Sequence, residues 1–186
     1  MTMTTTLART GSALAAAGLL IGMLSACTPE AEPTPKPTKS AAFASANLDS
    51  VRAATAAAEA TYRGYLTSSN EVDLAAPETF ESVFQWLAGD ALASARESYS
   101  AMRADGLTLT GESTFDRFDL VSHTDEEVVA ELCADVSMVN LTNEKGESVI
   151  SPNRVPRQRV EVQFVRSATP SGLAITRSTV VQESSC

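Results

Sequence analysis

The most regular stretch of this chain is VVAELCADVSM, from Val128 to Met138. Its even-numbered positions are all apolar: Val128, Ala130, Leu132, Ala134, Val136 and Met138. Glu131, Cys133 and Asp135 occupy the positions between them. Because successive side chains of a strand point to opposite faces of a sheet, this alternation predicts a strand with one buried and one hydrated face. Such a strand is typical of an antiparallel sheet that is covered on one side only.

Period-two patterns also occur on both sides of this stretch. They cover residues 107–120, 160–164 and 173–181, and turn signals separate them at 122–126, 143–146 and 169–172. We therefore expect about four antiparallel strands. If 128–138 lies beside the strand around 160, Arg157 and Arg159 face Glu131 and Asp135 across the sheet, in exposed pairs that assist register more than stability.

The residues before the strands have a helical period. Apolar residues recur at steps of three and four from Leu48 to Leu66, and Asn47 or Asp49 is placed to cap this first helix. A short helix is expected after Pro77. A third helix is expected after Asp90, which is placed to cap it, and this helix should end at Gly106. Helices followed by strands predict an α+β domain over residues 47–186.

Three features of this domain are familiar in combination. The first helix ends in Tyr62-x-x-Tyr65, and Cys133-Ala134-Asp135 precedes a glycine-containing hairpin and the late Cys186. This layout resembles the nuclear transport factor 2-like (cystatin-like cone) superfamily. More narrowly, it is similar to secreted lipoproteins of high-GC Gram-positive bacteria. The resemblance implies a curved, cone-like sheet, and the superfamily includes isomerases and hydrolases that use inward-facing Asp or Tyr side chains.

The N-terminus reads as an export signal. Arg9 precedes thirteen uncharged residues, 11–23, which are too few to cross a bilayer and suit the apolar core of a signal peptide. Leu24-Ser25-Ala26-Cys27 follows and resembles the bacterial lipobox, in which the cysteine thiol takes a diacylglycerol before cleavage. We therefore predict a lipoprotein signal peptide at 1–26 and a lipidated Cys27; an ordinary signal peptide is the alternative.

Residues 27–46 read as a tether. Four of the chain's 8 prolines fall between positions 28 and 39, and this density favours an extended polyproline II segment. Loss of residues 1–26 removes Arg9 and no acidic residue, so the net charge becomes more negative than the −9 of the whole chain. An acidic domain is repelled by anionic lipids. We therefore expect attachment to the outer face of the cell membrane to depend on the lipid at Cys27.

Two cysteines remain after lipidation, Cys133 and Cys186, and both face an oxidising exterior. A structural disulfide is the expected outcome, since no C-x-x-C spacing supports a redox pair. This disulfide would hold the chain end against the polar face of the sheet. Because it closes a long loop, it would stabilise the fold by about 4 kcal/mol in the chain-entropy model. We therefore expect the last strand to lie near strand 128–138.

Few residues of this sequence point to a cofactor or to a catalytic site. The acidic balance argues against nucleic-acid partners, and three cysteines with one histidine do not form a usual zinc site, so no cofactor is predicted. His123 lies in a predicted turn, where a hydrated loop residue is the simpler interpretation than a base. Tyr62, Tyr65 and Tyr99 are expected in the core rather than around a ligand.

Three functions stay open. The first is a non-catalytic lipoprotein that acts by protein contact or in envelope assembly. The second is a carrier of a small apolar ligand inside the cone, and the third is an isomerase or hydrolase that pairs Asp116 with Tyr62 or Tyr99. A closed apolar interior favours the first, an open dry cavity of several hundred Å³ the second, and a pocket carboxylate with a raised pKa the third.

Overall fold

The computed structural model describes residues 48–181 and residue 186. The expected signal peptide, Cys27 and the tether lie outside the described residues. The elements along the chain are α1 (Val51–Asn70), η1 (Pro77–Thr79), α2 (Phe80–Phe84), α3 (Gly89–Ala104), β1 (Thr108–Thr110), β2 (Thr114–His123), β3 (Glu127–Asp135), β4 (Asn140–Thr142), β5 (Arg157–Arg166) and β6 (Leu173–Val180). In the part of the chain that the structure describes, no helix combines the length and the apolar character needed to cross a membrane.

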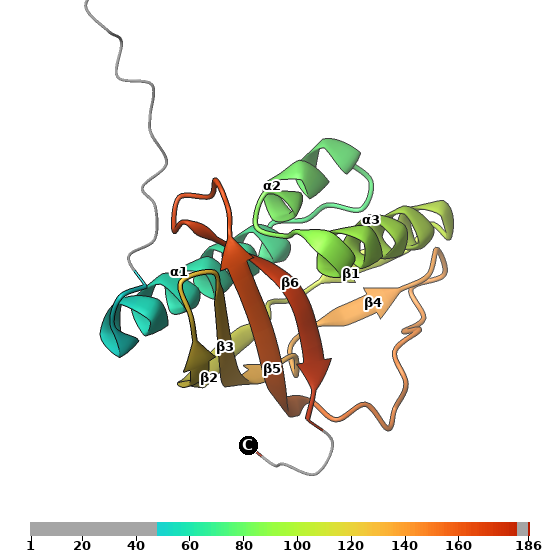
Figure 1. The fold of residues 1–186 in the computed structure, drawn as a ribbon. Coiled ribbons are helices and arrows are strands. Elements are labelled where there is room, and N and C mark those ends of the chain that lie inside the picture. Colours follow the sequence, from blue (N-terminus) through green and yellow to red (C-terminus); the bar gives the residue numbers. More distant parts are fainter. Residues whose placement is uncertain (1–47, 182–185) are drawn as a thin grey trace, which may run out of the picture. The chain divides into compact units, whose positions relative to one another are not determined.

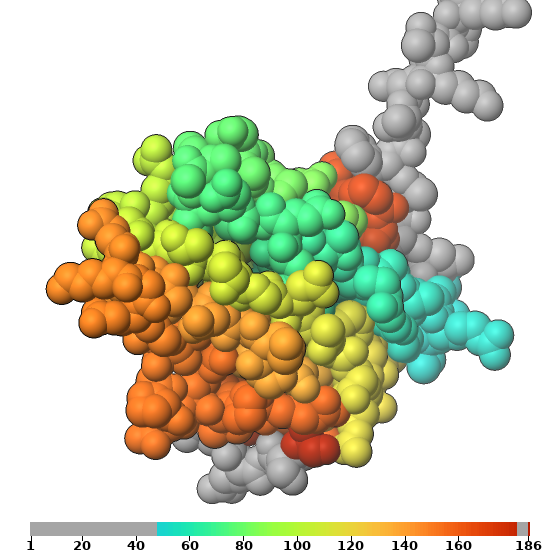
Figure 2. All heavy atoms as spheres, turned by 180° about the vertical axis from the view of Figure 1, so that it is seen from behind, coloured from blue at the N-terminus to red at the C-terminus, as the bar shows by residue number. Residues whose placement is uncertain are grey.

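The main sheet has four antiparallel strands in the order β2-β3-β5-β6, and the helices pack against one of its faces (Figure 1). The predicted fold class, helices on a curved antiparallel sheet of about four strands, is thus confirmed. A second, two-stranded sheet pairs β1 with β4. This pairing brings the 143–146 turn to the end of α3, where the Glu144 side chain lies beside Gly106; the orange β4 segment adjoins the yellow-green end of α3 in Figure 2.

The core lies between this sheet and α1. The inward side chains of β3 and β5 are those that the alternation predicts, and all are buried: Val128, Ala130, Leu132, Val160, Val162 and Phe164. Their partners on α1 include Ala54 and Ala58, whose solvent exposure is zero. Because alanine side chains are short, they allow the helix backbone to approach the sheet closely.

Several element boundaries differ from the prediction. The single strand expected over 107–120 is two strands, because the chain turns at Gly111, whose φ is +81°. β3 ends at Asp135, so Met138 lies beyond the sheet and is 75% exposed rather than buried. The hydroxyl of Ser50 caps α1 by accepting a bond from the Ala53 amide, and α3 begins at Gly89 without a side-chain cap, with Asp90 in its first turn.

The outer face of the sheet carries the disulfide. Cys133 and Cys186 are joined, with their Cα atoms 5.7 Å apart, and Cys133 is only 1% exposed although it faces away from the helices. The last strand was expected near the Cys133 strand: β6 does not pair with β3, because β5 lies between them, but Cys186 reaches Cys133 at the expected Cα separation. The Val181 amide donates to the carbonyl of Arg159, which is paired with Cys133, so the chain leaves β6 close to its cysteine partner.

Candidate functional site

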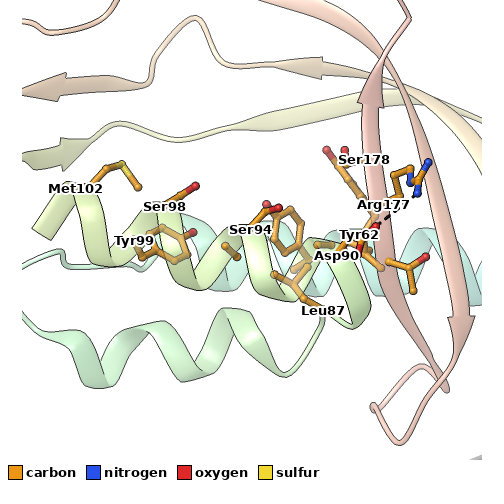
Figure 3. A pocket seen from close by; sticks show the side chains of 14 residues that line it. Tyr62, Leu87, Asp90, Ser94, Ser98, Tyr99, Met102, Arg177 and Ser178 are labelled. Atoms are coloured by element: carbon orange, nitrogen blue, oxygen red, sulfur yellow. Dashed lines mark ion pairs between the residues drawn. The ribbon is translucent and has the colours of Figure 1, made fainter.

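A cavity of about 390 Å³ opens between α1, α3 and β6. It lies on the helix side of the sheet, and its side chains follow α3 from Asp90 at one end to Met102 at the other (Figure 3). Tyr62 and Tyr65 of α1 contribute to its wall, and Leu87 lies in the segment before α3. The interior is therefore not closed, and the volume is that expected for a ligand carrier, although the end that holds Asp90 and Arg177 is open to water rather than dry.

One face of α3 forms the length of the cavity. Ala91, Ala95, Tyr99 and Met102 recur at steps of four, four and three, so they lie on one side of the helix. Ser94 and Ser98, one residue before Ala95 and Tyr99, are exposed and place hydroxyl groups along the rim. The two alanines leave the space that larger side chains would fill. The result is an elongated apolar floor with a polar border.

A β-bulge in β6 forms the opposite wall. Ile175 pairs with Phe164 while Arg177 pairs with Gln163, so Thr176 is an extra residue in the register. The edge of β6 is held at this point because Ile175 exchanges backbone hydrogen bonds with residues 86 and 88, at 2.9 and 2.8 Å. The bulge breaks the alternation, and four consecutive residues, 175–178, line the cavity.

The tyrosines of the cavity are neutral phenols. Burial raises the pKa of Tyr62 and of Tyr65, and burial raises the pKa of Tyr99 to about 12. The Tyr62 ring meets Phe115 edge to face at 5.0 Å, and the Tyr99 ring stacks on Phe80 at 5.1 Å. These groups donate hydrogen bonds and offer aromatic surface at neutral pH, but they do not act as bases there.

The expectation that these three tyrosines belong to the core is confirmed, because Tyr62 is a core residue and Tyr65 and Tyr99 pack against the core. Tyr62 is buried and packs in the core, and it also lines the cavity together with Tyr65 and Tyr99. Helical spacing identifies the inward face of a helix. It does not distinguish a side chain that fills the core from one that borders a cavity within it.

Charge is confined to one end of the cavity. Asp90 and Arg177 are the charged residues of its lining, and Nη2 of Arg177 lies 3.5 Å from Oδ2 of Asp90. Their side chains are 84% and 59% exposed, respectively. An ion pair this open to water contributes little to stability, because water screens it and both side chains keep their freedom.

The catalytic pair considered from sequence does not form. Asp116 lies on the outer face of the sheet, since its neighbour Phe115 points inward against Tyr62. Nη2 of Arg157 bonds both carboxylate oxygens of Asp116, at 2.5 and 2.6 Å, and these bonds lower the pKa of Asp116. The sheet separates this carboxylate from the tyrosines.

The other candidate groups lie apart from the cavity. The predicted cross-strand pairs are present: Arg159 bonds Glu131 at 2.8 Å, and Arg157 lies 3.7 Å from Asp135. His123 is the last residue of β2, opposite Val128, rather than part of the turn. Within residues 48–181 and 186, no group of His, Cys, Asp and Glu has the arrangement of a metal site.

Sequence reasoning missed most of the cavity. The helical period identifies Ala95, Tyr99 and Met102 as one face of α3, but it does not point to Ala91 or Arg177. The signal in the sequence is the pair of small, half-buried residues Ala91 and Ala95 on α3, opposite a strand that changes from buried to exposed after Ile175. A bulge has no sequence signature of its own here, so the wall at 176–178 was not predictable.

No family model matches this sequence, and no curated protein matches it. Among solved structures, the intermembrane-space region of the chloroplast protein ARC6 is similar at a TM-score of 0.50 and 18% identity, over 68% of this chain and 95% of that one. A protein assigned as an aromatic ring hydroxylase of Novosphingobium aromaticivorans has a TM-score of 0.49 and 14% identity, over 68% of this chain and 86% of that one. CagV of Helicobacter pylori, a VirB8 homologue, has a TM-score of 0.42 and 7% identity, over 68% of this chain and 97% of that one.

At 18% identity, the likeness to the ARC6 region shows a similar fold and nothing about activity, because one fold serves many functions.

Proposed function

We propose that this chain is a lipid-anchored extracytoplasmic binding protein that holds a small apolar molecule in the cavity between α1, α3 and β6. The observation that carries the proposal is the cavity itself, whose volume of about 390 Å³ falls within the range of small-molecule sites. Its lining has the usual composition of such sites, aromatic and aliphatic surface with a few hydroxyl groups.

The proposal includes the location that the sequence predicts. Cys27 carries the lipid, residues 27–46 hold the domain off the membrane, and the Cys133–Cys186 disulfide suits an oxidising compartment. Release of an apolar molecule into water is unfavourable. A binding domain tethered next to a membrane therefore sits where such a molecule is exchanged.

A cavity-filling variant tests the binding function. In Ala95→Trp an indole takes the place of a methyl group in the middle of the cavity floor, so an apolar probe loses its space. The matched control is Ala93→Trp, on the exposed side of the same helix and outside the lining. The probe is the neutral compound 4-phenyl-1-butanol, titrated by calorimetry into the full chain carrying Cys27→Ser and purified under oxidising conditions.

We expect the probe to bind the parent chain and Ala93→Trp equally, and Ala95→Trp at least tenfold more weakly. Near- and far-ultraviolet circular dichroism of each variant establishes that its fold is kept. Equal binding by Ala95→Trp and the parent, or no saturable binding by the parent, contradicts the proposed function.

A further inference from the structure

From the distribution of charge along the cavity, we infer that its ligand is an amphipathic monoanion. Its carboxylate binds Arg177, and its apolar body extends along α3 toward Tyr99 and Met102. This inference rests on the proposed function, because it assigns the chemical class of the molecule in the same cavity.

The shape of the cavity sets the direction of the ligand. From Asp90 to Met102 the lining follows three helical turns, about 18 Å at 1.5 Å per residue. Figure 3 shows the charged groups at one end and Tyr99 and Met102 toward the other, with Ser94 and Ser98 between them. An elongated molecule with one polar end matches this change from charged to apolar lining. A molecule that is polar at both ends would bury a polar group against Met102.

Arg177 is the group best placed to bind the polar end. Among the described residues its ion-pair partner is Asp90, through a single contact of 3.5 Å, so most of its five N–H donors are available. Arginine binds carboxylates through two parallel hydrogen bonds, which one such contact with Asp90 does not provide. A ligand carboxylate therefore forms a better pair with Arg177 than Asp90 does.

Asp90 explains why the head group is an anion rather than a cation. Its side chain is 84% exposed, against 59% for Arg177, so it projects farther into water. Water screens its attraction for a ligand ammonium group more strongly than it screens Arg177. Released from Arg177, the Asp90 carboxylate stays hydrated in the first turn of α3, where negative charge is favourable.

The polar neighbours of Arg177 also suit an anion. Ser178 follows it on β6, and Ser94 adds a hydroxyl from α3. Each of these two hydroxyls has one hydrogen bond to donate to a carboxylate oxygen. The hydroxyl of Thr176, on the other side of Arg177, is already engaged, because it donates to the carbonyl of Gln163 at 3.3 Å. The apolar part of the ligand meets Ala91 and Ala95 first and then the Tyr99 ring, whose face offers aromatic contact.

Three probes with one body and different head groups test this inference. 4-Phenylbutyrate, 4-phenyl-1-butanol and 4-phenylbutylamine are titrated by calorimetry into the full chain carrying Cys27→Ser. The variants are Arg177→Gln and Asp90→Asn, and the matched control for lost positive charge is Arg52→Gln, an exposed α1 residue outside the cavity lining.

We expect the parent chain to bind the acid about fivefold more tightly than the alcohol, and the amine no more tightly than the alcohol. Arg177→Gln brings the ratio of the acid and alcohol affinities to about one, because the partner of the carboxylate is lost, while Arg52→Gln keeps the preference for the acid. Asp90→Asn has the opposite effect, about twofold tighter binding of the acid, because it removes the competitor for Arg177. A merely structural role of the ion pair would shift both variants in the same direction.

Equal binding of acid and alcohol, a preference for the amine, or an acid preference that survives Arg177→Gln overturns the inference. If the alcohol still binds in a way that Ala95→Trp blocks, the proposed function survives that result. If no probe binds, both proposals fail.

Discussion

Gly64 shows how one missing side chain shapes the packing next to the cavity. It lies inside α1, and a Cβ at this position would overlap the six-membered ring of Trp86 at Cζ2 and Cη2. The ring is fixed in place because its Nε1 donates to the hydroxyl of Ser68 at 3.1 Å. The carbonyl of Trp86 itself accepts the hydrogen bond from the Ile175 amide at the edge of β6, so this contact supports the wall of the cavity.

Gly64→Ala should therefore destabilise the domain although alanine is the better helix former. The gain in helix propensity is about 1 kcal/mol, and the steric cost of an overpacked site is about 1–3 kcal/mol. We expect a net loss of about 1 kcal/mol in the free energy of unfolding, measured by urea titration. In a Trp86→Leu background the clash is absent, and the same substitution should raise stability; if it lowers stability there too, the ring contact is not the cause.

Asp116 shows the limit of prediction at the residue scale. Its strand and its cross-strand surroundings were predictable, but its face was not, because β2 has register shifts between Asp116 and Asp119 and between Leu120 and Ser122. Arg117, with a φ of +49°, lies in the first of these irregularities. Alternation fails where a strand bulges, so the inward or outward direction of such a residue is known only from the structure.

At the scale of elements, β3 was predictable and β1 and β4 were not. Val128, Ala130 and Leu132 of β3 are buried on the helix side as the alternation predicts, although Val129 and Cys133 of the other face are buried as well. β1 ends because Gly111 packs against the Met138 carbonyl, a residue 27 positions later. β4 has three half-buried residues and no alternation. Contacts distant in sequence, rather than local preference, decide where these short strands begin and end.

The disulfide links Cys186 to Cys133 of β3. The bond joins residues 53 apart, and in the chain-entropy model a loop of this length contributes about 4 kcal/mol. Cys133→Ser should lower the free energy of unfolding by about 2–5 kcal/mol, measured by urea titration of protein purified under oxidising conditions. Cys27→Ser is the control and should leave stability unchanged. Free thiols at both Cys133 and Cys186 in the native exported protein would contradict this account.

For the whole molecule, the anchor and the binding domain are separate parts of the proposal. Cys27→Ala should move the protein from washed membranes to the soluble fraction, because an acidic domain has no second attachment to anionic lipids. Circular dichroism of the released chain should match that of the parent. Cys186→Ser is the control and should remain with the membranes. Pelleting of the Cys27→Ala protein with washed membranes would contradict the lipid anchor.

The cavity is a property of the whole domain, and this is why the sequence did not predict it. Its walls come from α1, from α3 and from a bulge in β6, and the bulge is held by residues 86 and 88. Each of these pieces has an ordinary local pattern. Only their assembly leaves about 390 Å³ unfilled.

The central claim, that this cavity binds a ligand, is tested most directly by mapping a bound probe on the isotope-labelled full chain carrying Cys27→Ser. Titration with 4-phenylbutyrate, followed by backbone amide chemical shifts, reports every contact surface at once. The account predicts saturable shifts concentrated at Ala91, Ala95 and Tyr99 of α3 and at residues 175–178 of β6. Shifts spread over the surface, or concentrated on the outer face around Cys133, would contradict it.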